Sequence, residues 1–203
     1  MSVAYIGASN RDSLEVYHSI FEPAMQQIPF DNHRMILTRP SPEDGIFLER
    51  ADIIVLAGGS VETGWSAFEK NGFKDLIVRR FYEGAVLMGI SAGAVQLGRG
   101  GLTDDGHEHL STFGLLPFHV GVHSESDNWE LLRNTLSFTQ EPTMGIGIPS
   151  GGGLIYHFDT GVVEPVCKPL YDLSVEGDQH SETIIFPDSE ETPAPPTDPD
   201  PVQ

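Results

Sequence analysis

The chain contains a single cysteine, Cys167, among its 203 residues. One thiol excludes an internal disulfide and any zinc site built from cysteines. Cys167 ends a short apolar stretch that begins at Val162, and free cysteines are usually buried. We therefore expect a buried, unreactive thiol in a β-strand.

Basic residues are scarce, because 11 lysines and arginines stand against 30 aspartates and glutamates. The formal net charge is −19, which repels phosphate backbones and anionic membranes. Neither nucleic acid nor a membrane is therefore expected as a partner. The charge favours solubility, but it identifies no partner by itself.

Long apolar runs are also lacking, since none approaches the ~18 residues that a membrane span needs. The first residues, Met1 to Gly7, do not combine a basic region, an apolar stretch and a small-residue cleavage site. We expect them to form the first strand instead of a signal peptide. The sequence accordingly predicts a cytoplasmic protein.

The chain divides by composition into a long globular part and a short tail. Residues 1–186 mix apolar and polar segments in a length that suits one domain. Residues 187–203 hold six prolines among acids and small polar residues. Such a composition cannot bury enough apolar surface to offset the entropy lost on ordering, so we expect a disordered tail.

Strand-like and helix-like patterns alternate over the first ninety residues. Apolar runs predict strands at residues 3–8, 34–37, 52–57 and 85–89, and helical spacing predicts helices that begin near residues 14, 42 and 65. The first helix is expected to bury Leu14, Tyr17, Ile20 and Phe21, and the third to be interrupted near Asn71-Gly72.

This alternation predicts an α/β fold with a mostly parallel sheet and helices on both faces. After about Pro117 the strands are shorter and the turns richer in glycine, which indicates a partly antiparallel edge. Pattern alone leaves the strand order open.

The sharpest chemical signal is Gly89-Ile90-Ser91-Ala92-Gly93, between a predicted strand and a helix start rich in small residues. Gly-x-Ser-x-Gly in this setting is typical of a nucleophile elbow, which holds the serine hydroxyl clear of the sheet. The alternative is a tightly packed or anion-binding turn with no catalytic role. We expect Ser91 to be the nucleophile of a hydrolase.

A serine nucleophile needs a base, and spacing alone does not choose among the eight histidines. His18 falls on an expected surface helix face, and His180 borders the acidic tail. The others are His33, His107, His109, His119, His123 and His157.

Four blocks in order resemble the peptidase E (aspartyl dipeptidase) and cyanophycinase family of serine peptidases, which has a class I glutamine amidotransferase-like, flavodoxin-like fold. They span roughly residues 50 to 155. The blocks are the strand ending in Gly58-Gly59, the Ser-Ala-Gly-Ala turn at Ser91, the Gly-Leu-Leu-Pro segment from Gly114 that runs into His123, and the strand Gly145–Pro149.

The resemblance implies that Ser91 is the nucleophile and His123 its general base. It implies an oxyanion hole formed by the backbone N–H groups of Gly59 and Ala92. We expect His119, four residues before His123, either to support the site from behind or to be structural. No metal or organic cofactor is implied. The implied substrate is a small peptide or a compound derived from amino acids, and a homodimer stays open.

One departure concerns the third catalytic position, where the family typically has a glutamate that orients the histidine. Here that position is Ser150, which could accept the imidazole N–H but supplies no charge. A different carboxylate could substitute, or the protein could be a retired member that only binds a peptide or amino-acid ligand. The candidate carboxylates are Asp104, Asp105, Glu125, Asp127 and Asp159.

The segment Ser124–Trp129 lacks the phenylalanine and arginines common in the family, so aspartyl-dipeptide or cyanophycin specificity is not carried over. An esterase of the α/β-hydrolase type is a further alternative, with Asp104 or Asp105 as its acid. A glutamine amidotransferase is disfavoured, because its nucleophile would be a cysteine.

Overall fold

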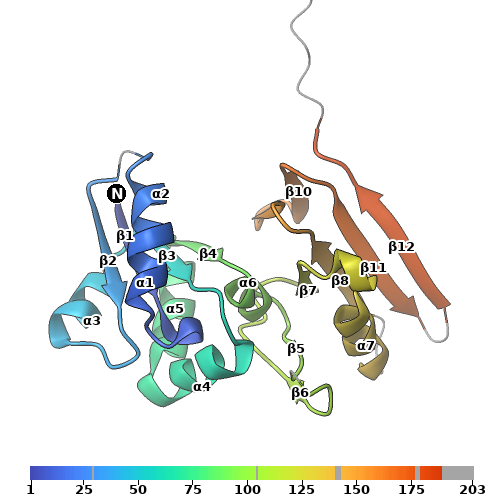
Figure 1. Cartoon of the computed structure of the whole chain (residues 1–203), viewed down its shortest axis with the longest axis horizontal. Coiled ribbons are helices and arrows are strands. Elements are labelled where there is room, and N and C mark those ends of the chain that lie inside the picture. Colours follow the sequence, from blue (N-terminus) through green and yellow to red (C-terminus); the bar gives the residue numbers. More distant parts are fainter. Residues whose placement is uncertain (29, 104, 140–142, 177–178, 189–203) are drawn as a thin grey trace, which may run out of the picture.

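The N-terminal half of the chain forms a four-stranded parallel sheet in the computed structural model, which describes residues 1–28, 30–103, 105–139, 143–176 and 179–188. Its strand order is β2-β1-β3-β4 (Figure 1). The α/β prediction is confirmed, and the order that the pattern left open is now defined. The strands are β1 (Ser2–Ile6), β2 (Asn32–Ile36), β3 (Ile53–Leu56) and β4 (Val86–Gly89).

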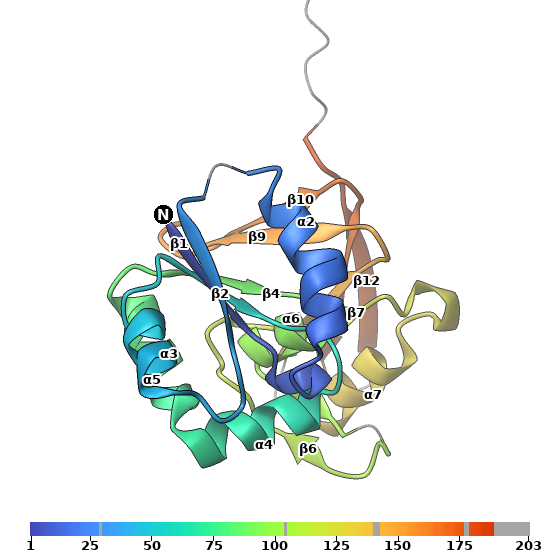
Figure 2. The same cartoon turned by 60° about the vertical axis from the view of Figure 1, so that its left-hand side comes forward.

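Helices cover both faces of this parallel sheet (Figure 2). One face packs against η2 through Tyr17 and Phe21, and the other packs against α4 and α5 through Phe68 and Ile77. The helical elements of this half are η1 (Ala8–Asn10), α1 (Leu14–Val16), η2 (Tyr17–Phe21), α2 (Glu22–Met25), α3 (Pro42–Leu48), α4 (Val61–Asn71), α5 (Phe73–Tyr82) and α6 (Ala92–Leu97).

The first helix differs from its expected apolar face. Tyr17 and Phe21 are buried and stack around Tyr5, but Leu14 and Ile20 are exposed. The reason is that η2 is a π-helical turn, whose wider winding shifts the residues that face the sheet. The prediction that Leu14 and Ile20 are buried is therefore wrong.

The expected interruption near Asn71-Gly72 is confirmed. Gly72 adopts a left-handed conformation with φ of 72°, which ends α4 and starts α5. Glycine adopts this conformation without the steric cost that a Cβ would bring.

A second four-stranded sheet follows, in the order β12-β11-β8-β7. β7 and β8 pair in parallel, whereas β8, β11 and β12 pair antiparallel, as predicted for this region. Two small hairpins accompany it. The remaining elements are β5 (Gly101–Leu102), β6 (His109–Leu110), β7 (His119–Val122), η3 (Glu125–Asp127), α7 (Glu130–Phe138), β8 (Thr143–Ile148), β9 (Gly153–His157), β10 (Val162–Val166), β11 (Leu170–Glu176) and β12 (Gln179–Ile185).

The second sheet is also covered on both faces. Leu132 and Leu136 of α7 pack on one face with Trp129 and Leu173. On the other face, Phe118 and its neighbours pack against Ala94 of α6 and against the β9–β10 hairpin. Because α6 also contacts β3 and β4, this helix joins the two sheets (Figure 1).

Strand β4 is an edge strand, since among the described residues it pairs with β3 alone. Val86 and Met88 pair with Ile53 and Val55, which lie under η2, yet they are themselves about half exposed. The helix that covers β1 and β3 thus leaves this end of the sheet open.

The prediction for Cys167 is wrong, because this residue is exposed. It lies just after β10 with φ of 65°, and the N–H of Lys168 donates to the carbonyl of Val166 at 2.8 Å. This three-residue γ-turn takes the chain out of the strand before the thiol can be buried.

Two features of the chain's organisation remain predictions. One is the single domain over residues 1–186. The other is the tail, of which residues 189–203 lie outside the described residues. In the part of the chain that the structure describes, no helix is both long and apolar enough to cross a membrane.

Candidate active site

Ser91 lies at the junction of β4 and α6, with φ of 51° and ψ of −111°. A positive φ is uncommon for a residue with a Cβ, and such strain persists only where the surroundings impose it. Here the N–H of Ile90 continues the ladder to Leu56 at 3.0 Å, and the carbonyl of Ser91 accepts from Ala94 at 2.9 Å. Strand and helix thus hold the turn from both sides.

The two glycines around Ser91 are required by close backbone approach. A Cβ on Gly89 would lie 2.4 Å from the backbone nitrogen of Ala94, and one on Gly93 would lie 2.3 Å from the carbonyl oxygen of Leu56. Neither position leaves room for a side chain, so α6 can lie directly against the sheet.

The Gly58-Gly59 loop lies beside this turn. A Cβ on Gly58 would be 3.3 Å from the Ser91 Cβ, and one on Gly59 would be 2.1 Å from the carbonyl oxygen of Ser9. Ser9 and Gln96 are buried and joined by a hydrogen bond of 3.1 Å from Gln96 Nε2 to Ser9 Oγ. These contacts fix the loop against both η1 and α6.

His123 follows the last residue of β7 and reaches Ser91. Its Nε2 lies 2.8 Å from the Ser91 hydroxyl oxygen, a hydrogen-bond distance. Its own backbone N–H donates to Ile148 of β8 at 2.9 Å, and its φ of 41° turns the chain sharply out of the strand. The parallel pairing of β7 with β8 therefore places the imidazole.

Ser150, predicted at the position of the orienting acid, lies two residues after the end of β8. Among the described residues, no hydrogen bond joins it to His123. Its backbone N–H instead donates to a carboxylate oxygen of Glu125 at 3.0 Å, and its carbonyl accepts from the Lys168 ammonium.

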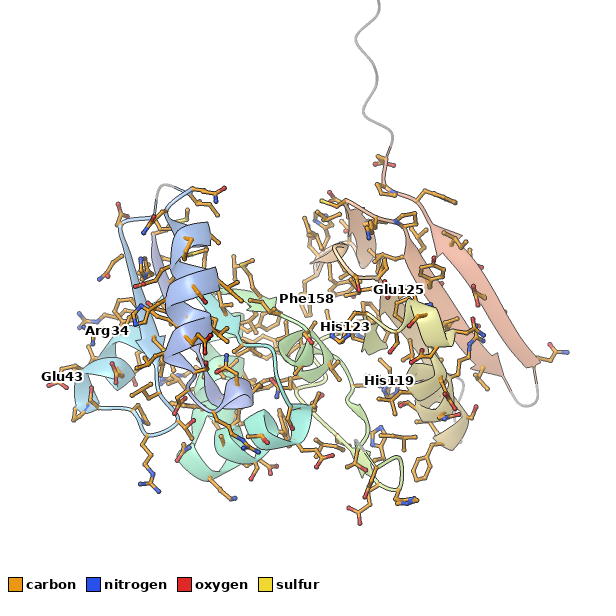
Figure 3. All side chains as sticks on the ribbon, viewed as in Figure 1. Arg34, Glu43, His119, His123, Glu125 and Phe158 are labelled. Carbon is orange, nitrogen blue, oxygen red and sulfur yellow. The ribbon has the colours of Figure 1, made fainter. Side chains whose placement is uncertain are left out.

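Glu125 brings a negative charge next to the histidine loop, two residues after His123 in the chain (Figure 3). Hydrogen bonds from its own backbone N–H and from that of Ser150 hold the pKa of the Glu125 carboxyl below its ordinary value. It is therefore ionised throughout the neutral range. The sequence offered Glu125 only as one of five candidate carboxylates. No pattern in the sequence around Ser150 predicts its contacts with Glu125 and Lys168.

The other candidate carboxylates that the structure describes make no recorded contact with His123. Asp105 accepts from Thr103 in the β5–β6 turn, Asp127 accepts from Glu130 at the start of α7, and Asp159 is exposed. Asp104 lies outside the described residues. Asp105, the other acid proposed for an esterase triad, thus makes no recorded contact with His123.

Most of the remaining histidines have partners away from Ser91. His18 pairs with Glu22, His33 with Tyr17 and His157 with Glu164, and buried His119 contacts the Gly100 carbonyl through Nδ1 at 2.8 Å. Among the described residues, no group of three His, Cys, Asp or Glu side chains could hold a metal ion.

The arrangement of helices on a parallel sheet, with the Ser91–His123 pair at the carboxyl ends of β4 and β7, defines a flavodoxin-like α/β protein of the class I glutamine amidotransferase-like type. More particularly, the chain belongs to peptidase family S51, whose model matches residues 2–161. The resemblance to the peptidase E family is confirmed, and a peptidase function is supported. No curated protein matches the chain.

Two solved structures share the fold. A peptidase from an acI-B1 actinobacterium matches with a TM-score of 0.66 at 15% identity, covering 90% of this chain and 83% of that one. A candidate peptidase E protein from Listeria monocytogenes EGD-e matches with a TM-score of 0.58 at 15% identity, covering 90% of this chain and 85% of that one. At this identity the likeness speaks for the fold alone.

We expect Gly93→Ala to destabilise the protein, because the new methyl group would overlap the Leu56 carbonyl. Overpacking of this kind costs about 1–3 kcal/mol or more. Gly45→Ala is the matched control, since nothing lies within 4 Å of its Cβ position inside α3, and it should add about 1 kcal/mol through helix propensity. Urea unfolding measures both, and equal effects would contradict the close approach.

Proposed function

We propose that the chain is a serine peptidase that cleaves a small peptide-like substrate, with Ser91 as nucleophile and His123 as general base. The observation that supports this best is the 2.8 Å contact between the Ser91 hydroxyl oxygen and His123 Nε2 at the end of a strained strand-to-helix turn. A hydroxyl attacks a carbonyl effectively only when such a base can take its proton.

In the proposed reaction, the Ser91 oxygen attacks the substrate carbonyl as its proton passes to His123 Nε2. The N–H groups of Gly59 and Ala92 would then stabilise the oxyanion, and His123 would return the proton to the leaving amine. Water completes the cycle by hydrolysing the acyl-enzyme. The closeness of Gly58 to Ser91 supports this assignment, because it brings the glycine loop to the hydroxyl. The mechanism uses no metal ion or organic cofactor.

Glu125 is proposed to supply the charge that Ser150 lacks. An ionised carboxylate near the imidazole stabilises the imidazolium that forms as the proton moves. Its hydrogen bond with Ser150 and its lowered pKa support the proposal, because they hold the carboxylate in place and keep it charged at the pH of catalysis.

A fluorophosphonate probe should label wild-type protein at Ser91, and both Ser91→Ala and His123→Asn should lose the label. The probe reacts with a serine whose hydroxyl is activated by a base. Mass spectrometry of the labelled peptide identifies the site. Wild-type protein that resists labelling as fully as Ser91→Ala would count against a serine peptidase.

A retired member that binds a peptide or amino-acid ligand is the second candidate. It is favoured by the lack, among the described residues, of a recorded hydrogen bond between Ser150 and His123. On this hypothesis, dipeptides raise the melting temperature of the wild-type protein but are not hydrolysed. Hydrolysis of any stabilising dipeptide, detected by release of free amino groups and lost in Ser91→Ala, would exclude it.

We expect Glu125→Gln to lower kcat by about ten-fold or more, because the amide keeps the size of the side chain but removes its charge. Asp159→Asn removes one negative charge from an exposed residue of the β9–β10 turn and should leave kcat unchanged. Initial rates on a peptide substrate, or rates of probe labelling, measure the difference. An equal effect of the two variants would mean that overall charge, not the position of Glu125, is responsible.

A further inference from the structure

A hollow lies at the end of the second sheet opposite to Ser91 and His123. It has a volume of about 400 Å³ and is bounded by the start of β7, the start of β8, strand β6 and the end of α7. His119 opens β7 and lines the hollow, whereas His123 follows the other end of the same strand (Figure 3). The hollow is thus distinct from the candidate active site.

The lining of this hollow is rich in hydrogen-bond donors. Among the described lining residues, Phe138 is the one apolar side chain, and none is an aspartate or a glutamate. The polar lining residues are Arg99, His109, Ser111, His119, Thr139 and Thr143. In a chain with 30 acids and 11 lysines and arginines, Arg99 with no acid among the other described lining residues gives this hollow a local positive charge.

Arg99 is available to a ligand. No ion pair recorded among the described residues involves it, although arginines Arg34, Arg79, Arg80 and Arg133 all pair with carboxylates. A guanidinium presents N–H groups in a planar fork that matches the oxygens of phosphate and carboxylate groups.

Two buried polar atoms of the lining have no partner in the described structure. These are Nε2 of His109 and the hydroxyl oxygen of Thr143, a residue that is only 8% exposed. A buried polar atom without a hydrogen bond costs free energy, so it normally marks a place where water or a ligand binds. Both atoms belong to residues on the same hollow as Arg99.

The two histidines are held close together. The rings of His109 and His119 are edge to face with centroids 5.7 Å apart, and His109 lies nearly parallel to Phe138. Burial lowers the pKa of both imidazoles, so Arg99 is the main positive charge of the hollow near neutral pH. An anion would favour protonation of either ring and would gain a further charged donor.

We propose that this hollow binds a small oxyanion, either inorganic phosphate or the carboxylate groups of a small metabolite, with Arg99 as the charged contact. Ser111, Thr139 and Thr143 supply hydroxyl donors to the same oxygens. The proposal is independent of the serine peptidase function, because it uses no residue of the Ser91–His123 site.

The test is isothermal titration of the full chain with sodium phosphate and, separately, with sodium succinate, at an ionic strength held constant with sodium chloride. Saturable binding of one of the two is expected and identifies which oxyanion the site prefers. Arg99→Gln should weaken that binding about ten-fold or more, as befits loss of a charge-assisted contact. Arg39→Gln, an exposed arginine elsewhere in the chain, should leave it unchanged, as should Ser91→Ala.

Thr143→Val provides a second measurement with an opposite sign. Replacing an unpartnered buried hydroxyl by a methyl group should leave the free protein as stable as wild type or more so, while the affinity for the oxyanion falls. Thermal unfolding with and without the anion reports both effects. The proposal is overturned if neither anion binds saturably, if Arg99→Gln and Arg39→Gln weaken binding equally, or if Thr143→Val keeps full affinity.

Discussion

The rest of the structure depends on how closely α6 lies against the first sheet. Gly93 leaves no space for a Cβ beside the Leu56 carbonyl, and Gly89 leaves none beside Ala94. The next residue of the helix, Ala94, packs into the core of the second sheet. One short helix therefore fixes the relative position of two sheets that are not hydrogen-bonded to each other among the described residues.

This constraint also explains how a pair of residues 32 positions apart can meet at 2.8 Å. Ser91 belongs to the first sheet through β4. His123 belongs to the second sheet through β7 and through the hydrogen bond from its backbone N–H to the carbonyl of Ile148. Both have positive φ values, so each strand turns away abruptly where its side chain is needed. The backbone conformation of both residues is unfavourable for an L-residue, and the packing of α6 and the β7–β8 pairing offset that cost.

Local features of the sequence were sufficient for the parallel sheet and for the turn at Ser91. Buried parallel strands are continuous apolar runs, and the glycine spacing around Ser91 reflects a steric limit that acts within a few residues. The face of the first helix was predicted wrongly, because a π-helical turn shifts the register of its side chains. The local sign of that turn is Pro23, two residues further on, which has no N–H to donate to the preceding turn of the helix. Cys167 was placed wrongly because a γ-turn ended the strand one residue early.

The contacts in the loops around His123 were beyond prediction from pattern for a different reason. The position of His123 came from the family resemblance, since eight histidines had no distinguishing spacing. The hydrogen bond from the Ser150 N–H to the Glu125 carboxylate joins residues 25 positions apart, in the loops after β7 and β8. Such a contact depends on which strands become neighbours, and Arg99, His109 and Thr143 come together around the hollow beside His119 in the same way.

The open edge of β4 has a consequence for how the protein behaves in concentrated solution. Val86 and Met88 are exposed apolar side chains on a strand with unpaired backbone groups, a combination that invites another strand to add. The net charge of −19 opposes such association by mutual repulsion between copies. Because salt shortens the range of that repulsion, colloidal stability should rest more on ionic strength than on the fold itself.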